Sequence, residues 1–298
     1  MKGILLAGGA GTRLYPVTSY TSKQLLTIYD KPMIYYPLSI LMIAGIKDIL
    51  LISTQRDLLL YKSLLGTGEH LGLSIDYLVQ EEPIGIAHAF LLAESFINQE
   101  PVCLVLGDNV LYGSGLPLRL RENTKLIDGA IVFGYWVSNP ERYGVIEYSE
   151  DGKVKTLEEK PKYPKSNYAV PGIYFYDKNV TDYAKELKPS MRGELEITDI
   201  NKIYLQKKRL RVDLLGRGIA WLDTGTPDSL LDAANFVATI DRRQGLKIAC
   251  IEEIAYRMGY INEEMLENIM VPMPESDYKN YIKKILFQHV DQDKILIT

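Results

Sequence analysis

Short apolar runs alternate with longer amphipathic stretches through the first half of the chain. Runs rich in leucine, isoleucine and valine predict strands at 3–7, 49–52, 75–79 and 102–106. Between these runs, apolar positions at helical spacing predict helices at 37–44 and 86–96. Strands that alternate with helices are typical of βαβ units, so we expect a mostly parallel sheet covered by helices on both faces.

Closely spaced strand patterns replace this alternation after about residue 130. Strands are expected at 130–137, 143–148, 154–157 and 172–176. The pairs Asn139-Pro140 and Asp151-Gly152 between them are typical of turns. This pattern indicates an antiparallel insertion.

Helical periodicity dominates the rest of the chain. A helix at 196–207 precedes a strand at 211–215, and further helices are expected at 227–241, 251–258 and 277–287. The whole pattern predicts an α/β fold with a Rossmann-like, mostly parallel sheet flanked by helices, an inserted antiparallel part and C-terminal helices. We expect the α/β domain at 1–240, with the insertion at roughly 130–180, and a C-terminal helical part at 241–298.

The composition is that of an ordinary globular protein, with 298 residues, 47% hydrophobic and 24% charged. The net charge of −4 argues against polymeric nucleic acid as a partner, because binding it needs an extended basic surface. Two distant cysteines, Cys103 and Cys250, exclude a structural zinc site and a disulfide scaffold, so we expect a cytoplasmic protein. The longest apolar stretch, 37–46, is interrupted by Ser39 and is too short for a membrane span.

A glycine-rich turn follows the first predicted strand directly, Gly8-Gly9-Ala10-Gly11-Thr12-Arg13-Leu14. Backbone N–H groups in such a turn can converge on a phosphate, although glycines also simply mark tight turns. The motif lacks the Gly-Lys-Ser/Thr end of a P-loop, and Leu14 stands where a dinucleotide-binding motif has its third glycine. Arg13 and Lys23, two cationic donors on the same connection, favour phosphate binding.

This turn and several later blocks, in a fixed order, resemble the sugar-1-phosphate nucleotidyltransferases, and most closely the glucose-1-phosphate thymidylyltransferases. The later blocks are 22–26, 31–37, Gly107-Asp108-Asn109, 140–145, Glu158-Glu159-Lys160-Pro161, 192–199 and 221–225. The likeness covers nearly the whole chain up to about residue 287. Several independent blocks in one order are far more specific than any single block.

The resemblance implies transfer of a thymidylyl group from dTTP to glucose 1-phosphate, giving dTDP-glucose and pyrophosphate for deoxysugar (dTDP-rhamnose type) and cell-surface polysaccharide synthesis. A phosphate oxygen of the sugar phosphate attacks the α-phosphorus in line, and this anion needs no general base. Mg²⁺ is the implied cofactor, held by Asp108 and Asp223, because this ion prefers carboxylate and phosphate oxygens. Taken singly, Asp108 could be a turn residue, and Asp223 could cap the helix expected at 227, where Thr226 is better placed.

The family blocks also imply roles for other residues. The implied catalytic cations are Arg13, Lys23 and Lys160. The implied nucleotide-binding residues are Gly8, Gly11, Thr12, Arg13, Lys23, Gln80, Pro83, Gly85 and Asp108. The implied sugar-phosphate-binding residues are Tyr143, Gly144, Glu159, Lys160, Val170, Arg192 and Trp221.

Plainer interpretations stand beside these roles. Glu158-Glu159-Lys160 alone is typical of a solvated charged turn, and a single Trp such as Trp221 is more often a core residue. The Gln80 amide matches one edge of thymine, but uracil presents the same edge. A nucleotidyltransferase specific for UTP or for another sugar 1-phosphate is therefore the alternative, and a noncatalytic nucleotide-sugar sensor on the same fold is a second one.

Three positions differ from the family pattern. His88 stands where Gln is expected, Thr27 where Pro is expected and Pro171 where Thr is expected. His88 follows the base-binding segment closely, so it bears on the choice of base or of deoxyribose. Thr27 and Pro171 bear on the stiffness of their loops.

The stretch 246–259 has apolar residues on one side of a predicted helix, and such a face usually packs on its own domain. Related enzymes form homotetramers through this part and bind a nucleotide sugar there as a feedback inhibitor. The resemblance thus implies a homotetramer and a second site for a dTDP-sugar. We expect Tyr112, Gly113 and Arg257 to contribute to that site.

Overall fold

The computed structural model describes residues 1–9 and 11–287, and its centre is a ten-stranded sheet. One half consists of the parallel strands β1 (Lys2–Leu6), β4 (Asp48–Ser53), β5 (Ser74–Val79) and β6 (Val102–Leu106). Their order is β6-β1-β4-β5. All four strands lie where the apolar runs predicted them.

The sheet changes direction at β12 (Ile173–Tyr176), which pairs antiparallel with both β6 and β8 (Ala130–Trp136). Beyond β8 lie β11 (Tyr168–Ala169), β9 (Gly144–Tyr148) and β10 (Val154–Glu159), all antiparallel to their neighbours, while β13 (Leu210–Leu214) pairs parallel with β8. The predicted antiparallel strands are therefore confirmed. The sequence pattern did not predict β11, because two residues are too few to show a period.

Side chains on the sheet alternate between two apolar clusters. Leu5, Val105 and Phe175 belong to one cluster, which includes residues of α1 (Tyr35–Ile43), α2 (Leu58–Leu65) and α5 (Leu116–Asn123). Ile4 and Leu104 belong to the other, with residues of α3 (His88–Leu92), α4 (Glu94–Ile97), α6 (Val180–Glu186) and α7 (Ile197–Gln206). Both faces of the sheet are thus covered, which explains the nearly continuous apolar runs of its central strands.

One predicted helix is divided in the structure. The stretch expected as a helix at 86–96 forms α3 and α4, because Ala93 between them has φ −87° and ψ 8°, outside helical geometry. Apolar spacing continues across this break, so periodicity alone did not reveal it.

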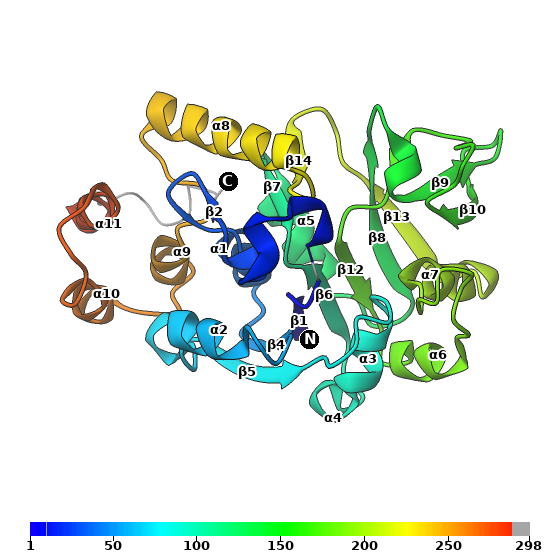
Figure 1. Cartoon of the computed structure of the whole chain (residues 1–298), viewed down its shortest axis with the longest axis horizontal. Coiled ribbons are helices and arrows are strands. Elements are labelled where there is room, and N and C mark those ends of the chain that lie inside the picture. Colours follow the sequence, from blue (N-terminus) through cyan, green and yellow to red (C-terminus); the bar gives the residue numbers. More distant parts are fainter. Residues whose placement is uncertain (10, 288–298) are drawn as a thin grey trace.

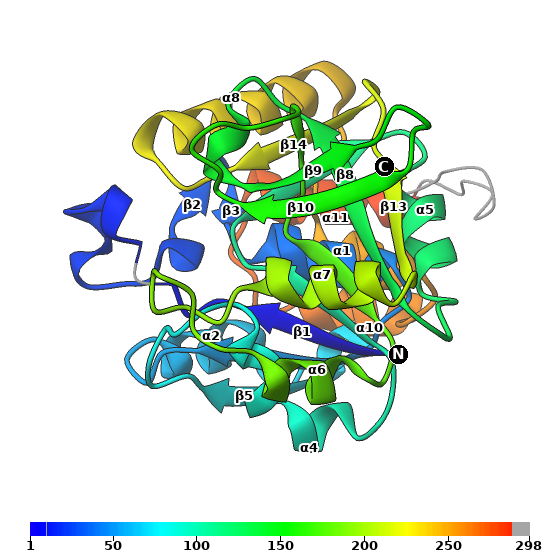
Figure 2. The ribbon, with the colours of Figure 1, turned by 90° about the vertical axis from the view of Figure 1, so that its right-hand side faces the viewer.

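Two small antiparallel pairs and several 3-10 turns surround the carboxyl ends of the parallel strands. The pairs are β2 (Thr27–Ile28) with β3 (Lys31–Pro32), and β7 (Asn109–Gly113) with β14 (Ile219–Asp223). The turns there are η1 (Thr12–Leu14), η2 (Val17–Ser19), η3 (Lys23–Leu25) and η5 (Pro140–Arg142), while η4 (Glu69–Leu71) lies just before the start of β5. Figure 2 shows the blue segment after β1 projecting beyond the carboxyl end of that strand.

Helix α8 (Pro227–Gln244) begins at a complete capping box. The side chain of Thr226 accepts from the Ser229 amide, and Ser229 Oγ accepts from the Thr226 amide at 2.9 Å. Thr226, not Asp223, therefore caps this helix, as the sequence predicted. Asp223 is left free for another role.

The C-terminal helices α9 (Ile251–Arg257), α10 (Glu263–Met270) and α11 (Asp277–Phe287) lie at the opposite end of the molecule's long axis from β9 and β10 (Figure 1). Residues of all three helices belong to the same apolar cluster as α1. The division at residue 240 stays a prediction, and 288–298 of the predicted C-terminal part lie outside the described residues. Within 1–9 and 11–287, the structure contains no helix long and apolar enough to cross a membrane.

Candidate active site

The pairing of β7 with β14 brings together two aspartates that are far apart in the sequence. Asp108 lies between β6 and β7, and Asp223 is the last residue of β14. In the strand register Asp223 stands opposite Asn109, and Thr224 Oγ1 donates to the Asp108 carbonyl at 2.9 Å. The predicted metal-binding aspartates therefore lie at one site, which sequence spacing could not show.

Both aspartates line an open cleft of about 490 Å³ between the parallel half of the sheet and the antiparallel part. Nine of its lining residues were predicted as site residues: Arg13, Asp108, Tyr143, Gly144, Glu159, Lys160, Val170, Trp221 and Asp223. The lining comes from eight separate segments of the chain. The cleft thus gathers two predicted nucleotide-binding residues, Arg13 and Asp108, and most of the predicted sugar-binding residues.

Lys23 does not line this cleft, but its ammonium group forms an ion pair with Asp108 Oδ2. Their side chains are only 12% and 19% exposed, so water screens this pair weakly. Burial opposes ionisation of Asp108, but the Lys23 charge and hydrogen bonds from Lys23 and Asn109 outweigh it and hold the pKa of this carboxyl below its usual value. Asp108 is therefore an anion at neutral pH.

Asp223 is held by a different set of donors. Its Oδ2 accepts from Arg142 Nη2 and from the Tyr143 hydroxyl, each at 2.9 Å, and its Oδ1 accepts from the Gly225 amide at 2.6 Å. Burial and the neighbouring Asp223 charge raise the pKa of Tyr143, so this phenol stays neutral and donates.

Arg13 approaches Asp223 across Gly225. A Cβ atom at Gly225 would lie 2.6 Å from Arg13 Nη2 and 2.7 Å from Asp223 Oδ1. Only glycine leaves room for the guanidinium at this point. The family block 221–225 thus has a steric reason for its final glycine.

The other end of the cleft contains the predicted sugar-binding residues. Thr198 donates to Glu159 Oε2, and the Lys160 ammonium lies 3.9 Å from Glu159 Oε1. The Val170 amide donates to the Gly144 carbonyl at 2.8 Å, which fixes the backbone beside Glu159. Among the residues that the structure describes, none donates a hydrogen bond to Glu159 Oε1, so this oxygen can accept from a sugar hydroxyl.

Arg192 lies beside the cleft rather than in its lining. Its guanidinium is 2.7 Å from Glu194 and 3.7 Å from both Glu159 and Glu196. The guanidinium of Arg192 is therefore close to Glu159, but it already lies near three carboxylates. A role at the sugar phosphate requires Arg192 to change partners.

The predicted base-binding residues lie outside the cleft lining. Gln80 is buried, and its Nε2 lies 3.2 Å from His88 Nδ1, while a Cβ at Gly8 would lie 3.0 Å from Gln80 Oε1. Burial lowers the pKa of His88 despite the Glu82 charge, so its neutral ring can accept from Gln80. The unexpected His88 therefore touches the residue predicted to read the base.

The remaining residues that were predicted to bind the nucleotide have mainly backbone roles in the structure. Gly11 has φ +61°, and its carbonyl accepts from Thr18 Oγ1 at 2.8 Å, while Thr12 opens η1. Gly85 has φ +115°, and a Cβ there would lie 2.4 Å from the Leu195 carbonyl oxygen. Gly85 is thus required by the close approach of another backbone segment, and Pro83 lies exposed on the same connection.

Sequence reasoning missed three residues that organise the site. Asn109 accepts from the Gly172 amide at 3.0 Å and from Trp221 Nε1 at 2.6 Å, and it donates to Asp108. Arg142 contacts Asp223, and Thr198 contacts Glu159. All three stand inside the quoted family blocks, so their position in those blocks was the available signal.

The two carboxylates fit a divalent cation of the Mg²⁺ kind. Such an ion is usually held by one or two carboxylates together with substrate phosphates and water, which matches the two aspartates lining an open cleft. Among residues 1–9 and 11–287, the structure contains no group of three or more His, Cys, Asp or Glu side chains that could enclose a metal. The donor set therefore suits an ion that arrives with the nucleotide rather than a permanently caged one.

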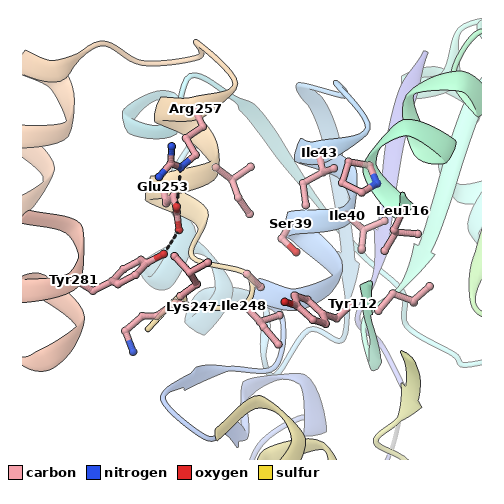
Figure 3. A pocket seen from close by; sticks show the side chains of 15 residues that line it. Ser39, Ile40, Ile43, Tyr112, Leu116, Lys247, Ile248, Glu253, Arg257 and Tyr281 are labelled. Carbon is pink, nitrogen blue, oxygen red and sulfur yellow. Dashed lines mark hydrogen bonds and ion pairs between the residues drawn. The ribbon is translucent and has the colours of Figure 1, made fainter. Parts of the chain in front are cut away.

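A second cavity contains two of the three predicted regulatory residues. Tyr112 and Arg257 line it, together with residues of α1, α5 and α11, as Figure 3 shows. Arg257 Nε donates to Glu253 Oε1 at 2.7 Å, and Tyr281 donates to Glu253 Oε2. Gly113 does not line this cavity, because it packs against Gly218, whose oxygen would lie 2.3 Å from a Cβ there.

Comparison with known proteins defines the class of this chain. The family model described as nucleotidyl transferase matches residues 2–240, so the chain belongs to that family. A glucose-1-phosphate thymidylyltransferase of Xanthomonas campestris pv. campestris is 56% identical to it, over 94% of this chain and 95% of the relative. The enzyme of the same name from Mycobacterium tuberculosis is 55% identical, over 96% of this chain and 99% of the relative.

Solved structures agree in fold. A structure assigned as a glucose-1-phosphate thymidylyltransferase of Bacillus anthracis, in complex with sucrose, superposes with a TM-score of 0.73 at 44% identity, covering 79% of this chain and 94% of that one. A UDP-glucose pyrophosphorylase complexed with UDP-glucose superposes with a TM-score of 0.67 at 28% identity, covering 80% of this chain and 98% of that one. The fold is thus shared by structures named as a glucose-1-phosphate thymidylyltransferase and as a UDP-glucose pyrophosphorylase.

The Lys23–Asp108 pair predicts a pH-dependent loss of stability in a Lys23→Met variant. Without the ammonium, only the Asn109 side chain and a backbone hydrogen bond still oppose the effect of burial, so the pKa of Asp108 rises and its ionisation stabilises the fold less than in the wild type. At pH 7 the variant is expected to lose about 1–3 kcal/mol of unfolding free energy, and the loss should shrink as pH falls towards 4. Urea denaturation at several pH values measures this difference.

Lys125→Met is the matched control, because Lys125 also pairs with a carboxylate, Glu122, but both side chains are exposed. Its effect should stay within about 0.5 kcal/mol and vary little with pH. A Lys23→Met defect that is the same at pH 4 and pH 7 would contradict the electrostatic interpretation.

Proposed function

We propose that this protein transfers the thymidylyl group of dTTP to glucose 1-phosphate, releasing pyrophosphate and forming dTDP-glucose. The observation that carries the proposal is that one cleft brings together two aspartates, Asp108 just before β7 and Asp223 at the end of its partner strand β14, with a predicted sugar-binding end. Relatives above 50% identity that cover nearly the whole chain are named for this reaction. The expected use of dTDP-glucose in deoxysugar and cell-surface polysaccharide synthesis, and a cytoplasmic location, form part of the same proposal.

The chemistry assigned to the chain's own residues is positioning and charge neutralisation. A phosphate oxygen of glucose 1-phosphate forms the new bond to the α-phosphorus, and the bond to the β-phosphate oxygen breaks, so pyrophosphate leaves with the electron pair. Arg13 and Lys23 hold and neutralise the triphosphate, and Lys160 holds the sugar phosphate. Glu159 accepts from sugar hydroxyls, and Gln80 reads the pyrimidine edge.

Mg²⁺ is the proposed cofactor, held by Asp108 and Asp223. When bound, it would neutralise charge on the phosphates and align them for in-line displacement. Asp108 is an anion at neutral pH, and Asp223 has one oxygen, Oδ1, whose only donor is the Gly225 amide among the described residues. Both carboxylates are therefore suited to a hard cation.

A uridylyl transfer from UTP is the second candidate. The structural similarity to a UDP-glucose pyrophosphorylase favours it, and Gln80 presents the same hydrogen-bonding groups to uracil as to thymine. The two candidates differ by one methyl group on the base and one hydroxyl on the sugar of the nucleotide.

Pyrophosphate release measured over a matrix of nucleotides and sugar 1-phosphates distinguishes these candidates. The combination of dTTP with glucose 1-phosphate is expected to give the highest kcat/KM. UTP should be poorer by about 10-fold or more, since one methyl group in an apolar contact is worth roughly 1–3 kcal/mol. A higher kcat/KM with UTP than with dTTP would replace the proposed nucleotide.

Replacing either Asp108 or Asp223 by Asn tests the metal assignment. Each variant should lower kcat by at least about 100-fold, because Asn keeps the shape but not the charge that binds the cation. Turnover and its Mg²⁺ dependence are measured together with circular dichroism. Asp128→Asn, at an exposed aspartate paired with Arg209, is the control and should keep full activity. Unchanged turnover in both Asp108→Asn and Asp223→Asn would contradict a metal site made of these two carboxylates.

We also propose that a dTDP-sugar binds as a feedback inhibitor at the cavity lined by Tyr112 and Arg257, which measures about 50 Å³ and so takes only part of the ligand, and that the C-terminal helices build a homotetramer. The inhibitor site is supported by the surroundings of Arg257. Its side chain is only 10% exposed, and its Nη2 has no hydrogen-bond partner among the described residues. A buried donor without a partner is costly, and a phosphate or carbonyl oxygen in the cavity would satisfy it.

The Arg257→Ala variant tests this second site. Calorimetric titration of the wild type with dTDP-glucose should show two sites per subunit, and the variant should lose one while kcat with dTTP stays unchanged. Arg243→Ala, an exposed arginine of α8, should keep both. Light scattering gives the oligomeric state in the same samples. One site per subunit in every protein would exclude the regulatory proposal.

A further inference from the structure

Asp57 is a fully buried carboxylate that lies outside the cleft lining. It occupies the position directly before α2, where an aspartate normally accepts hydrogen bonds from the first amides of the helix. Its side chain makes no such capping bond, although it is 0% exposed. Burial of a carboxylate is costly unless other donors compensate it, so its partners indicate its role.

The Asp57 carboxylate points to the segment that follows the glycine-rich turn. Oδ1 accepts from the backbone amide of Ser22 at 3.2 Å. Arg56 Nη2 and Thr54 Oγ1 each donate to Oδ2 at 2.9 Å, so a cation and a hydroxyl balance the buried charge. The carboxylate is thus held rigidly while one oxygen binds a backbone 35 residues away.

Two further contacts fasten the same segment to α2 and to the residue pair just before it. Ser22 Oγ and the Tyr61 hydroxyl are hydrogen-bonded at 2.5 Å, and both residues are buried. Arg56 Nη1 donates to the Ser19 carbonyl at 3.4 Å. The three contacts all reach residues 19–22, immediately before Lys23.

Lys23 directly follows this attachment in the chain. Ser22 is the residue before η3, whose first residue is Lys23, so the Ser22 backbone sets the start of that turn. The Lys23 side chain then passes the glycine turn, where its Cε lies 3.9 Å from the Cβ position of Gly9, and ends on Asp108. The outer part of the segment, residues 15–20, offers Lys23 little support, since the side chains of Tyr15 and Tyr20 are each 75% exposed.

We propose that Asp57 is a positioning residue for nucleotidyl transfer, which holds Ser22 so that the Lys23 ammonium stays at Asp108 and at the nucleotide phosphates. This role rests on the proposed function of Lys23. Asp57 touches neither substrate nor metal in this scheme, and it acts only through the Ser22 backbone. A displacement of about 1 Å at a charge-neutralising group can cost about 100-fold in rate.

A double-mutant cycle with Lys23 separates positioning from general support of the fold. Asp57→Ala should lower kcat with dTTP by about 10- to 100-fold, and Asp57→Asn, which keeps a carbonyl oxygen for the Ser22 amide, should recover much of it. In a Lys23→Met background, Asp57→Ala should lower kcat by no more than about 2-fold, because the group it positions is already gone. A full additional loss in that background overturns the proposal.

Asp177→Ala is the matched control for burial. Asp177 is 1% exposed and accepts from the Gly129 amide and the Tyr204 hydroxyl, far in the sequence from the Lys23 segment. This variant should lose stability like Asp57→Ala but keep kcat. If Asp177→Ala lowers kcat as much as Asp57→Ala does, the effect on turnover reports stability and not positioning.

Limited trypsin digestion tests the same attachment without requiring activity. The bond after Lys23 is protected in the wild type, because Lys23 is 12% exposed at its side chain and Gln24 is buried. Asp57→Ala should accelerate cleavage at this bond by at least about 10-fold, and Asp177→Ala should not, with fragments identified by mass spectrometry. If the bond after Lys23 is equally protected in all three proteins, the proposal is overturned. If the wild type releases no pyrophosphate but the three proteins still show the expected cleavage pattern, only the proposed reaction is rejected.

Discussion

The antiparallel pairing of β7 with β14 is the constraint on which the candidate active site depends. It places Asp223 opposite Asn109 and so beside Asp108, although 115 positions (223 − 108) separate the two aspartates in the chain. A shift of one residue in this register would turn Asp223 to the other face of the pair. Asn109 stabilises the register, because it accepts from Trp221 on the partner strand and from Gly172 just before β12.

Opposite charges are paired throughout the cleft before any ligand is bound. Asp108 is paired with Lys23, Asp223 with Arg142, and Glu159 lies near Lys160. These pairs compensate the charges of the site, and in the proposed reaction each pair would separate as a phosphate took the cation and a metal ion took the carboxylate. A net charge of −4 is compatible with the two anionic substrates of that proposal, because only a local excess of donors is needed.

Local patterns predicted much of the fold. The strands β1, β4, β5 and β6 and the helix α11 lie where apolar periodicity indicated, because each buries a continuous or regularly spaced set of apolar side chains. The division of the helix expected at 86–96 and the two-residue strand β11 were not predicted, since a break at Ala93 and a strand of that length leave no periodic trace. Family blocks indicated Asp108, Asp223 and Glu159, but they gave no contacts for Arg142, Thr198 or Asn109.

The sequence by itself determined the class of fold, the family that its motif blocks resemble and the kinds of side chain available at the site. Tertiary structure decided which of those residues meet: that Asp108 and Asp223 line one cleft, that Gly85 makes room for Leu195, and that Gly113 packs against Gly218 outside the Arg257 cavity. It also decided that Asp57 turns away from its own helix towards Ser22. Periodicity and turn chemistry act between neighbours in the chain, whereas strand register, close backbone approach and buried polar contacts join residues that only folding brings together.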